Sequence, residues 1–461
     1  MAQQVFQKYS QRMQWWMDAR FGVSYHWGLY SIPARGEWVR SSEKMSLESY
    51  RGYFDAFKGE NYDPRQWAKS AYGAGMRYAI LTTKHHDGFC LFDSALTQYK
   101  STNTPARRDL VREYVEAFRA QGLKVGLYYS LLDWQHPDYP AWHDRQHPLR
   151  FDVAHKERPR NWDNYVRYLH GQVRELLSNY GKIDLLVFDF SYDGFHGAKW
   201  GADELVKMIR ELQPDIVLND RLDHAQSGGI KTANPPAWVG DFDTCELNMP
   251  HQATRNAAGE IVPWELWITH NNSWGYGSAD SVYKSPSAII HALVNCVSKS
   301  GNLTLNFSPD ATGRICQQSL DVQREIGRWM QPNAASIYGC GMTEWDRPDW
   351  GRFTTDGRRL FAHITEQPMG HLTLPGLRGK LRNARLLSTG AECLLGDFWN
   401  LPVQSFGQAD DVFLNLNRPI AHTHCMPDPV DTVIAMDLVP EAQQAEVAKE
   451  QTAVITPGPL A

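Results

Sequence analysis

A run of two histidines and an aspartate, His85-His86-Asp87, is the first group in this sequence whose side chains could carry out chemistry. Imidazole and carboxylate groups together can bind a metal ion, transfer protons or hydrogen-bond a polar ligand. Other polar and aromatic residues follow apolar runs in the same way: His26, Glu37, Trp38, Tyr128, Tyr129, Asp189, Arg221, Glu246 and Trp274. Donors and acceptors interspersed with aromatic planes are what a sugar ring requires, because its hydroxyls need hydrogen bonds and its C–H face needs a flat apolar surface.

Two carboxylates in this set could break a glycosidic bond. Asp189 ends the strongly apolar run "LLVFDF", and carboxylates are rarely buried without a cation or a catalytic task. Glu246 is the natural second carboxylate. A retaining glycosidase holds two such groups roughly 5–5.5 Å apart, one as nucleophile and one as general acid/base. Arg221 could hydrogen-bond a substrate oxygen near them, or form a plain ion pair with a neighbouring carboxylate.

Eight short apolar runs, separated by amphipathic helical stretches, must position these residues. Most of the runs are continuously apolar, as strands buried on both faces are. They lie at 21–26, 77–83, 124–130, 183–189, 215–220, 243–246, 266–270 and 302–307. The alternation predicts an α/β fold, a (β/α)8 TIM-like barrel, with functional residues just past the C-terminal ends of the strands. A doubly wound sheet is the alternative, weakened because no G-x-G-x-x-G motif follows a strand.

The pattern changes after about residue 345. A hairpin is expected across Asp356-Gly357, and further short strands follow without helical spacing. We therefore predict a barrel over 1–345, a small all-β sandwich over 346–440 and a loosely ordered tail over 441–461.

Composition excludes several function classes. The 461 residues are 42% hydrophobic and carry a net charge of −5, so neither nucleic acid nor an anionic membrane is an expected partner. No apolar run has the length of a membrane span, and the N-terminus lacks the layout of a signal peptide. The seven cysteines include no C-x-x-C pair. We expect reduced thiols, a cytoplasmic location, and neither a zinc site nor a cofactor.

The strand-end segments together carry a family resemblance. They are "RFGVSYHWGLYSIPARGEW", "TKHHDGFCLFDS", "GLYYSLLDW", "LLVFDF", "VLNDR", "GDFDTCE", "WELWITHNNSWGYG" and "GNLTLNFSPDATGRI", in this order over residues 20 to about 315. With these segments the sequence resembles the α-L-fucosidases of glycoside hydrolase family 29. The resemblance implies retaining exo-hydrolysis of terminal α-L-fucosyl residues from oligosaccharides or glycoconjugates.

The resemblance also implies a role for each matching residue. Asp189 matches the nucleophile, which forms a covalent fucosyl-enzyme. Trp274 matches an aromatic residue that packs on the C5 methyl of the sugar. Residues matching those that hold the hydroxyls and the ring oxygen are His26, Glu37, Trp38, His85, His86, Tyr129 and Arg221. Tyr129 is preferred over Tyr128 because it lies nearer the end of its strand.

The acid/base is a choice between two glutamates. Glu246 ends the sixth predicted strand, where a barrel places catalytic groups, whereas Glu265 precedes the seventh predicted strand. We therefore favour Glu246 as the acid/base.

Three other interpretations stay open. The same mechanism could serve an α-L-galactoside. A metal-dependent barrel hydrolase is disfavoured because strand one offers only His26, and adjacent histidines such as His85-His86 rarely share one metal. A non-catalytic sugar-binding protein would leave both carboxylates without a task. The glycosidic linkage and the formation of a homo-oligomer are not determined by the sequence.

Overall fold

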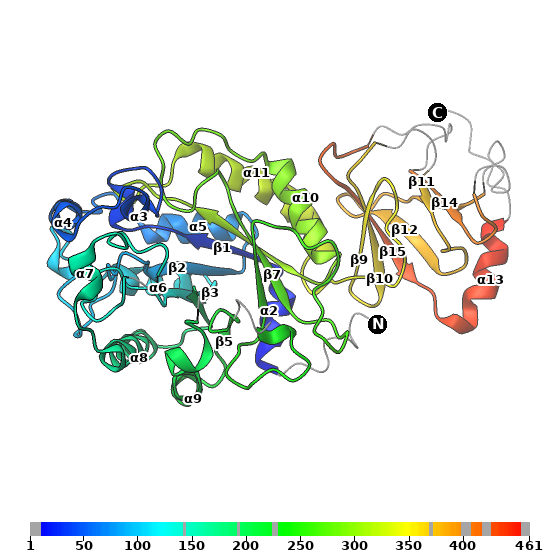
Figure 1. Ribbon diagram of the computed structural model, residues 1–461. Helices are drawn as coiled ribbons and strands as arrows, with labels where there is room; N and C mark the ends of the chain where they lie inside the picture. The colour runs from blue at the N-terminus through cyan, green and yellow to red at the C-terminus, as the bar shows by residue number, and fades with distance from the viewer. Residues whose placement is uncertain are drawn as a thin grey trace. The chain divides into compact units, whose positions relative to one another are not determined.

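The computed structural model of this chain describes residues 11–141, 144–190, 194–223, 229–367, 372–397, 407–416 and 426–452. Its internal contacts divide the chain into two compact units (Figure 1). One unit comprises Gln11–Lys284 and Leu303–Glu325, and the other contains Ser285–Asn302 together with the chain from Ile326 onward. The domain boundaries expected at residues 345 and 440 stay predictions.

The first unit is built on eight parallel strands. They are β1 (Phe21–Tyr25), β2 (Tyr78–Lys84), β3 (Lys124–Ser130), β4 (Leu185–Asp189), β5 (Val217–Leu218), β6 (Asp243–Glu246), β7 (Trp264–Thr269) and β8 (Asn302–Phe307). Their order in the sheet is β5-β4-β3-β2-β1-β8-β7-β6. A parallel bridge between Asn219 and Phe242 joins the two end strands, so the sheet returns on itself. The predicted TIM-like barrel is confirmed.

Helices between the strands begin and end where the sequence indicates. The helices of the chain are α2 (Gln11–Ala19), α3 (Val39–Ser42), α4 (Leu47–Ala56), α5 (Pro64–Gly73), α6 (Leu110–Ala120), α7 (Val153–Glu157), α8 (Trp162–Asn179), α9 (Ala202–Leu212), α10 (Pro286–Val297), α11 (Gln317–Asn333) and α13 (Glu441–Thr452). Asp109 caps α6 by accepting a hydrogen bond from the Arg112 backbone N–H. Gly122 follows that helix with a φ of 84°, which favours glycine.

The expected helical crossovers fail on one side of the barrel. Among the described residues, no α-helix lies between β5 and β6 or between β6 and β7. These segments contain "NPP" and "NMP", and proline disfavours a helix interior. The N-terminal helix α2 packs there instead: the Trp16 ring stacks on Phe242 at 4.5 Å, and Asp241 pairs with both Arg12 and Arg210.

The second unit contains two antiparallel sheets. Their strands are β9 (Gly351–Thr355), β10 (Arg359–Ile364), β11 (Leu372–Leu374), β12 (Leu381–Leu386), β13 (Leu394–Gly396), β14 (Val412–Asn415) and β15 (Thr432–Leu438), ordered β12-β15-β10-β9 and β11-β14-β13. Leu360 and Ile434 from one sheet share a buried core with Leu374 and Leu414 from the other. The predicted β-sandwich and the hairpin between β9 and β10 are confirmed.

The last segment differs from the loosely ordered tail that the sequence suggested. Glu441–Thr452 form helix α13, and residues 453–461 lie outside the described residues. The Gln451 side chain explains why the helix is held. It accepts a hydrogen bond from the Gly379 backbone N–H at 2.7 Å and donates one to the Leu381 carbonyl at 2.8 Å.

Six of the seven cysteines are described, and all six are free thiols. In the described ranges, no helix is both long enough and apolar enough to cross a bilayer.

Candidate active site

A cavity opens at the C-terminal ends of the barrel strands. Nine of the ten predicted site residues line it: His26, Glu37, Trp38, His85, His86, Asp189, Arg221, Glu246 and Trp274. The lining also includes Tyr128, over which Tyr129 was preferred, and three residues that were not predicted, Phe190, Asn219 and Trp267.

One guanidinium connects the two candidate carboxylates. Arg221, just past β5, donates from Nη1 to Asp189 Oδ1 at 3.3 Å and from Nη2 to Glu246 Oε2 at 3.0 Å. Burial opposes the charge of Arg221, but Asp189 and Glu246 outweigh it, so the pKa of the guanidinium is raised. The carboxylates differ in access, because the Glu246 side chain is 43% exposed and that of Asp189 only 19%. Asp189 is the recessed group and Glu246 the one open to solvent.

Tyr128 approaches Asp189, and this corrects the choice of Tyr129. The Tyr128 hydroxyl donates to Asp189 Oδ2 at 2.6 Å. Tyr129 points away from the cavity and donates to Gln172 Oε1 at 2.8 Å. Consecutive strand residues face opposite sides of a sheet. Since Ser130 is in register with Asp189, Tyr128 shares the face of Asp189 and Tyr129 does not. The sequence already contained this alternation, but Tyr129 was chosen because it lies nearer the strand end.

The tautomer of His26 follows from its neighbours. Asn306 donates from Nδ2 to the Trp274 carbonyl at 2.8 Å, which turns its Oδ1 toward His26 Nδ1 at 2.7 Å. An amide oxygen only accepts, so His26 Nδ1 must carry the hydrogen. Burial lowers the pKa of His26 to about 3, against the hydrogen bond to Asn306. The neutral ring therefore offers Nε2 as an acceptor.

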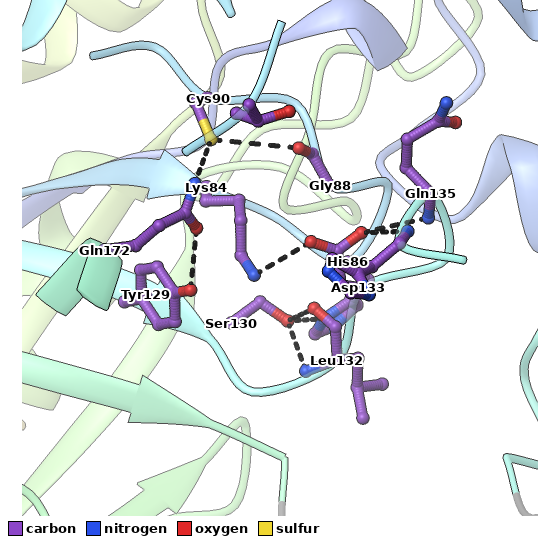
Figure 2. A network of polar contacts seen from close by, with 12 residues as sticks. Lys84, His86, Gly88, Cys90, Tyr129, Ser130, Leu132, Asp133, Gln135 and Gln172 are labelled. Carbon is purple, nitrogen blue, oxygen red and sulfur yellow. Dashed lines mark hydrogen bonds and ion pairs between the residues drawn. The ribbon is translucent and has the colours of Figure 1, made fainter. Parts of the chain in front are cut away.

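His86 is held by a buried network behind the cavity (Figure 2). Its Nδ1 lies 2.6 Å from Ser130 Oγ, and its Nε2 lies 3.7 Å from Asp189 Oδ2. The Trp134 backbone N–H donates to the His86 carbonyl at 2.8 Å. Close by, the fully buried Lys84 and Asp133 form an ion pair at 3.2 Å. Burial first, and the charge of Lys84 second, lower the pKa of His86 to about 3, so its ring is neutral.

His85 is the second neutral imidazole of this pair. Burial lowers its pKa well below the ordinary value, and the neighbouring rings of His86 and His26 act in the same direction. Its Nδ1 is buried and has no hydrogen-bond partner among the described residues. Asp87 turns away from the cavity: it accepts hydrogen bonds from the Tyr50 hydroxyl and from the Phe89 backbone N–H. It therefore supports the loop.

An acidic group and two indoles complete the lining. Glu37 Oε2 accepts a hydrogen bond from the Gly275 backbone N–H at 2.7 Å, and burial raises the pKa of this carboxyl. The Trp274 ring lies 5.3 Å from the ring of His26. The Trp38 ring lies 4.9 Å from that of His86. These planes give the cavity apolar walls beside its hydrogen-bonding groups.

Glu265, the rival acid/base, lies inside the barrel. Glu265 was expected to precede the seventh strand. Strand β7 begins at Trp264, so Glu265 instead belongs to the strand. Its carboxylate accepts hydrogen bonds from Thr304 Oγ1 at 2.6 Å and from the side chains of Tyr78 and Trp267. Burial raises its pKa to about 7 against these hydrogen bonds. Glu265 does not line the cavity, whereas Glu246 does.

A metal site would need several ligating side chains that converge on one point. Within the part of the chain that the structure describes, no group of three or more His, Cys, Asp and Glu side chains is placed to hold a metal ion.

Known proteins resemble this chain along most of its length. Residues 2–335 match the alpha-L-fucosidase family. The human tissue alpha-L-fucosidase is 29% identical over 382 residues, which are 77% of this chain and 76% of that protein. Alpha-L-fucosidase isoenzyme 1 from Paenibacillus thiaminolyticus is 51% identical, with a TM-score of 0.89 over 95% of this chain and 100% of that one.

A further solved relative carries mechanistic information. A family 29 alpha-L-fucosidase from Bacteroides thetaiotaomicron is 25% identical, with a TM-score of 0.79 over 94% of this chain and 97% of that one. That structure is a trapped covalent intermediate in complex with 2-fluoro-fucosyl fluoride, obtained with a glutamate-to-glutamine variant.

Proposed function

This chain belongs to the alpha-L-fucosidase family, and we propose that Asp189 is its nucleophile and Glu246 its general acid/base. The family hydrolyses α-L-fucosides with retention, through a covalent fucosyl-enzyme. The observation that carries the assignment is the Arg221 guanidinium, which binds both carboxylates in the cavity. The glutamate variant used to trap the covalent intermediate in the Bacteroides enzyme supports a glutamate in the acid/base role.

The two carboxylates divide the reaction as follows. Protonated Glu246 gives its proton to the glycosidic oxygen while an Asp189 oxygen bonds to C1 and the C1–O bond of the leaving group breaks. Glu246, now a carboxylate, then takes a proton from water, and the water oxygen bonds to C1 as the bond to Asp189 breaks. The greater exposure of Glu246 suits a group that must exchange protons with bulk water.

The neutral histidines suit the recognition of uncharged hydroxyls. His26 Nε2 is an acceptor, so it would accept a hydrogen bond from a sugar hydroxyl. The buried His85 Nδ1 has a hydrogen-bonding capacity that no described residue uses, and a hydroxyl would satisfy it. Trp274 offers an apolar surface for the C5 methyl. A contact of this size discriminates by only about 1–3 kcal/mol, so α-L-galactosides are expected to be slow substrates rather than inert ones.

Proton NMR of the first-formed product tests the function directly. Two successive displacements at C1 restore the original configuration, so hydrolysis of p-nitrophenyl α-L-fucoside should release α-fucose before mutarotation. Release of β-fucose would contradict a double displacement, and an absence of hydrolysis would contradict the function itself.

A pair of adjacent tyrosines offers a matched test of the site. Tyr128→Phe removes a hydrogen bond to a charged carboxylate, which is worth about 1.5–3 kcal/mol, so kcat/KM should fall about 10- to 100-fold. Tyr129→Phe, one residue away and outside the cavity, should leave kcat/KM for the same substrate within about twofold. The reverse order of effects would contradict the assignment of Tyr128.

Fucosylated oligosaccharides or glycoconjugates are the substrates that this family acts on. The exclusion of nucleic acid and membrane as partners, and the cytoplasmic location, stay predictions from charge and cysteine usage.

A further inference from the structure

A second cavity, of about 390 Å³, lies away from the two carboxylates. We call it the cation pocket, and its lining is Asp138, Pro140, Arg158, Arg160, Trp162, Phe195 and Lys199. Trp162 begins α8, and the other lining residues come from the segments between β3 and α8 and between β4 and α9. In a (β/α)8 barrel such segments lie at the end where the strands finish, so the cation pocket is on the same face as the sugar cavity.

A short chain of contacts joins the two cavities. The Trp134 ring lies 5.5 Å from the Trp38 ring, which lines the sugar cavity. Trp134 Nε1 donates to Asp144 Oδ2 at 2.8 Å, and the Tyr139 hydroxyl donates to the same oxygen at 3.2 Å. The Tyr139 carbonyl in turn accepts a hydrogen bond from Arg160 Nε at 2.9 Å. Few side chains therefore separate the cation pocket from the place where fucose would bind.

The pocket carries a positive charge on an acidic protein. Three cations, Arg158, Arg160 and Lys199, face one acid, Asp138, whereas the whole chain has a net charge of −5. Both oxygens of Asp138 already accept hydrogen bonds from the N-terminal end of α8, at 3.1 and 2.5 Å. Arg158 and Lys199 are exposed, so their charged groups can reach a ligand in the pocket. Burial first, and Arg158 next, lower the pKa of Arg160, as expected where positive charge is not neutralised.

An indole held in place forms the apolar part of the pocket. Trp162 is half-buried at the start of α8, and its Nε1 donates to the Lys199 carbonyl at 3.0 Å. Its ring lies 5.0 Å from Phe195 and 5.4 Å from Trp200. A fixed aromatic plane next to guanidinium and ammonium groups suits a sugar residue that bears an anion.

We infer that the cation pocket binds an anionic sugar residue of the glycan that carries the fucose. The recognised group is a carboxylate or a sulfate ester, and the aromatic plane of Trp162 supports the sugar ring. This inference rests on the proposed function for its substrate but not for its binding chemistry. It assigns the enzyme a preference for acidic fucosylated glycans over their neutral counterparts.

Three substrates with the same fucosylated core, one neutral and two that carry an anionic group, test the preference. They are 3-fucosyllactose, its 3′-sialylated form and its 3′-sulfated form, compared by kcat/KM. We expect an advantage of about tenfold for at least one anionic substrate, which declines as salt screens the charges. The sialylated and sulfated arms distinguish a carboxylate from a sulfate as the recognised group. Equal kcat/KM values for all three substrates would overturn the inference.

A double variant with a matched control locates the effect. Arg158→Ala/Lys199→Ala should abolish the advantage and leave hydrolysis of p-nitrophenyl α-L-fucoside unchanged. Arg174→Ala/Lys207→Ala removes the same charge from exposed positions of α8 and α9 outside the pocket lining, and it should keep the advantage. An advantage that survives the first double variant, or is lost equally in both, would contradict the cation pocket as the site.

Binding without hydrolysis separates this inference from the proposed function. Isothermal titration calorimetry with 3′-sialyllactose, lactose 3′-sulfate and lactose needs no fucosidase activity. Suppose that 3′-sialyllactose or lactose 3′-sulfate binds and that Arg158→Ala/Lys199→Ala abolishes this binding. That result would support the cation pocket even if the catalytic assignment failed. Binding indistinguishable from that of neutral lactose would count against it.

Discussion

Replacing Asp189 with alanine should lower kcat for p-nitrophenyl α-L-fucoside on the order of 10³-fold or more. The variant lacks the oxygen that bonds to C1, so the covalent intermediate cannot form. Azide can enter the space left by the carboxylate and attack C1 directly. A single displacement inverts the configuration, so the rescued product should be β-fucosyl azide, identified by NMR.

A control variant next to the same strand separates a loss of stability from a loss of chemistry. Asp184 lies just before β4, at the opposite end from the cavity, and its Oδ1 pairs with Lys124. Asp184→Asn should change the thermal midpoint without a comparable loss of kcat. A near-normal kcat in Asp189→Ala, or an α-fucosyl azide product from it, would rule out Asp189 as the nucleophile.

Replacing Glu246 with alanine should produce the second large loss, and one that depends on the leaving group. General acid/base catalysis is worth on the order of 10²–10⁴-fold, and a poor leaving group needs the proton most. Oligosaccharide hydrolysis should therefore fall further than hydrolysis of the p-nitrophenyl glycoside. Azide needs no general base, so it should attack C1 of the fucosyl-enzyme and displace the fucosyl group from Asp189. Two displacements have then occurred, and the product should be α-fucosyl azide.

Glu265→Gln is the comparison that can reverse this assignment. The substitution keeps the shape of the side chain but disturbs the hydrogen bonds from Thr304, Tyr78 and Trp267, so its main effect should be a lower thermal midpoint. Azide should not raise its activity. Azide rescue in a Glu265 variant, together with none in Glu246→Ala, would exchange the two roles.

Sequence alone predicted those parts of the site that depend on strand ends. Asp189 closes an apolar run and Glu246 closes a short predicted strand, and both occupy the last position of a barrel strand. Tyr129 was preferred over Tyr128 because nearness to the strand end was given more weight than the side of the sheet that each residue faces. Register with Asp189 decides that side, and register is a property of pairing between strands rather than of one segment.

Long-range contacts account for much of what the sequence could not provide. The pKa of His86 is lowered mainly by burial, ahead of the charge of Lys84, and that burial depends on how distant segments pack around the ring. Helix α13 has little amphipathic pattern of its own, and its Gln451 finds partners on a distant loop and strand. In each case local propensity is overruled by tertiary contacts that only the folded chain contains.

The closing seam of the barrel has a mechanical consequence. Strand β5 pairs with β4 through only two residues, and a single bridge joins its far side to the segment before β6. Strand β4 pairs with β3 through five residues, so Asp189 stands on the well-bonded side. Arg221 lies just past β5, beside this seam, whereas Glu246 ends β6, which pairs with β7 through four residues. Thermal opening of the barrel should therefore begin beside Arg221, which binds both carboxylates, while the strands that carry Asp189 and Glu246 stay paired.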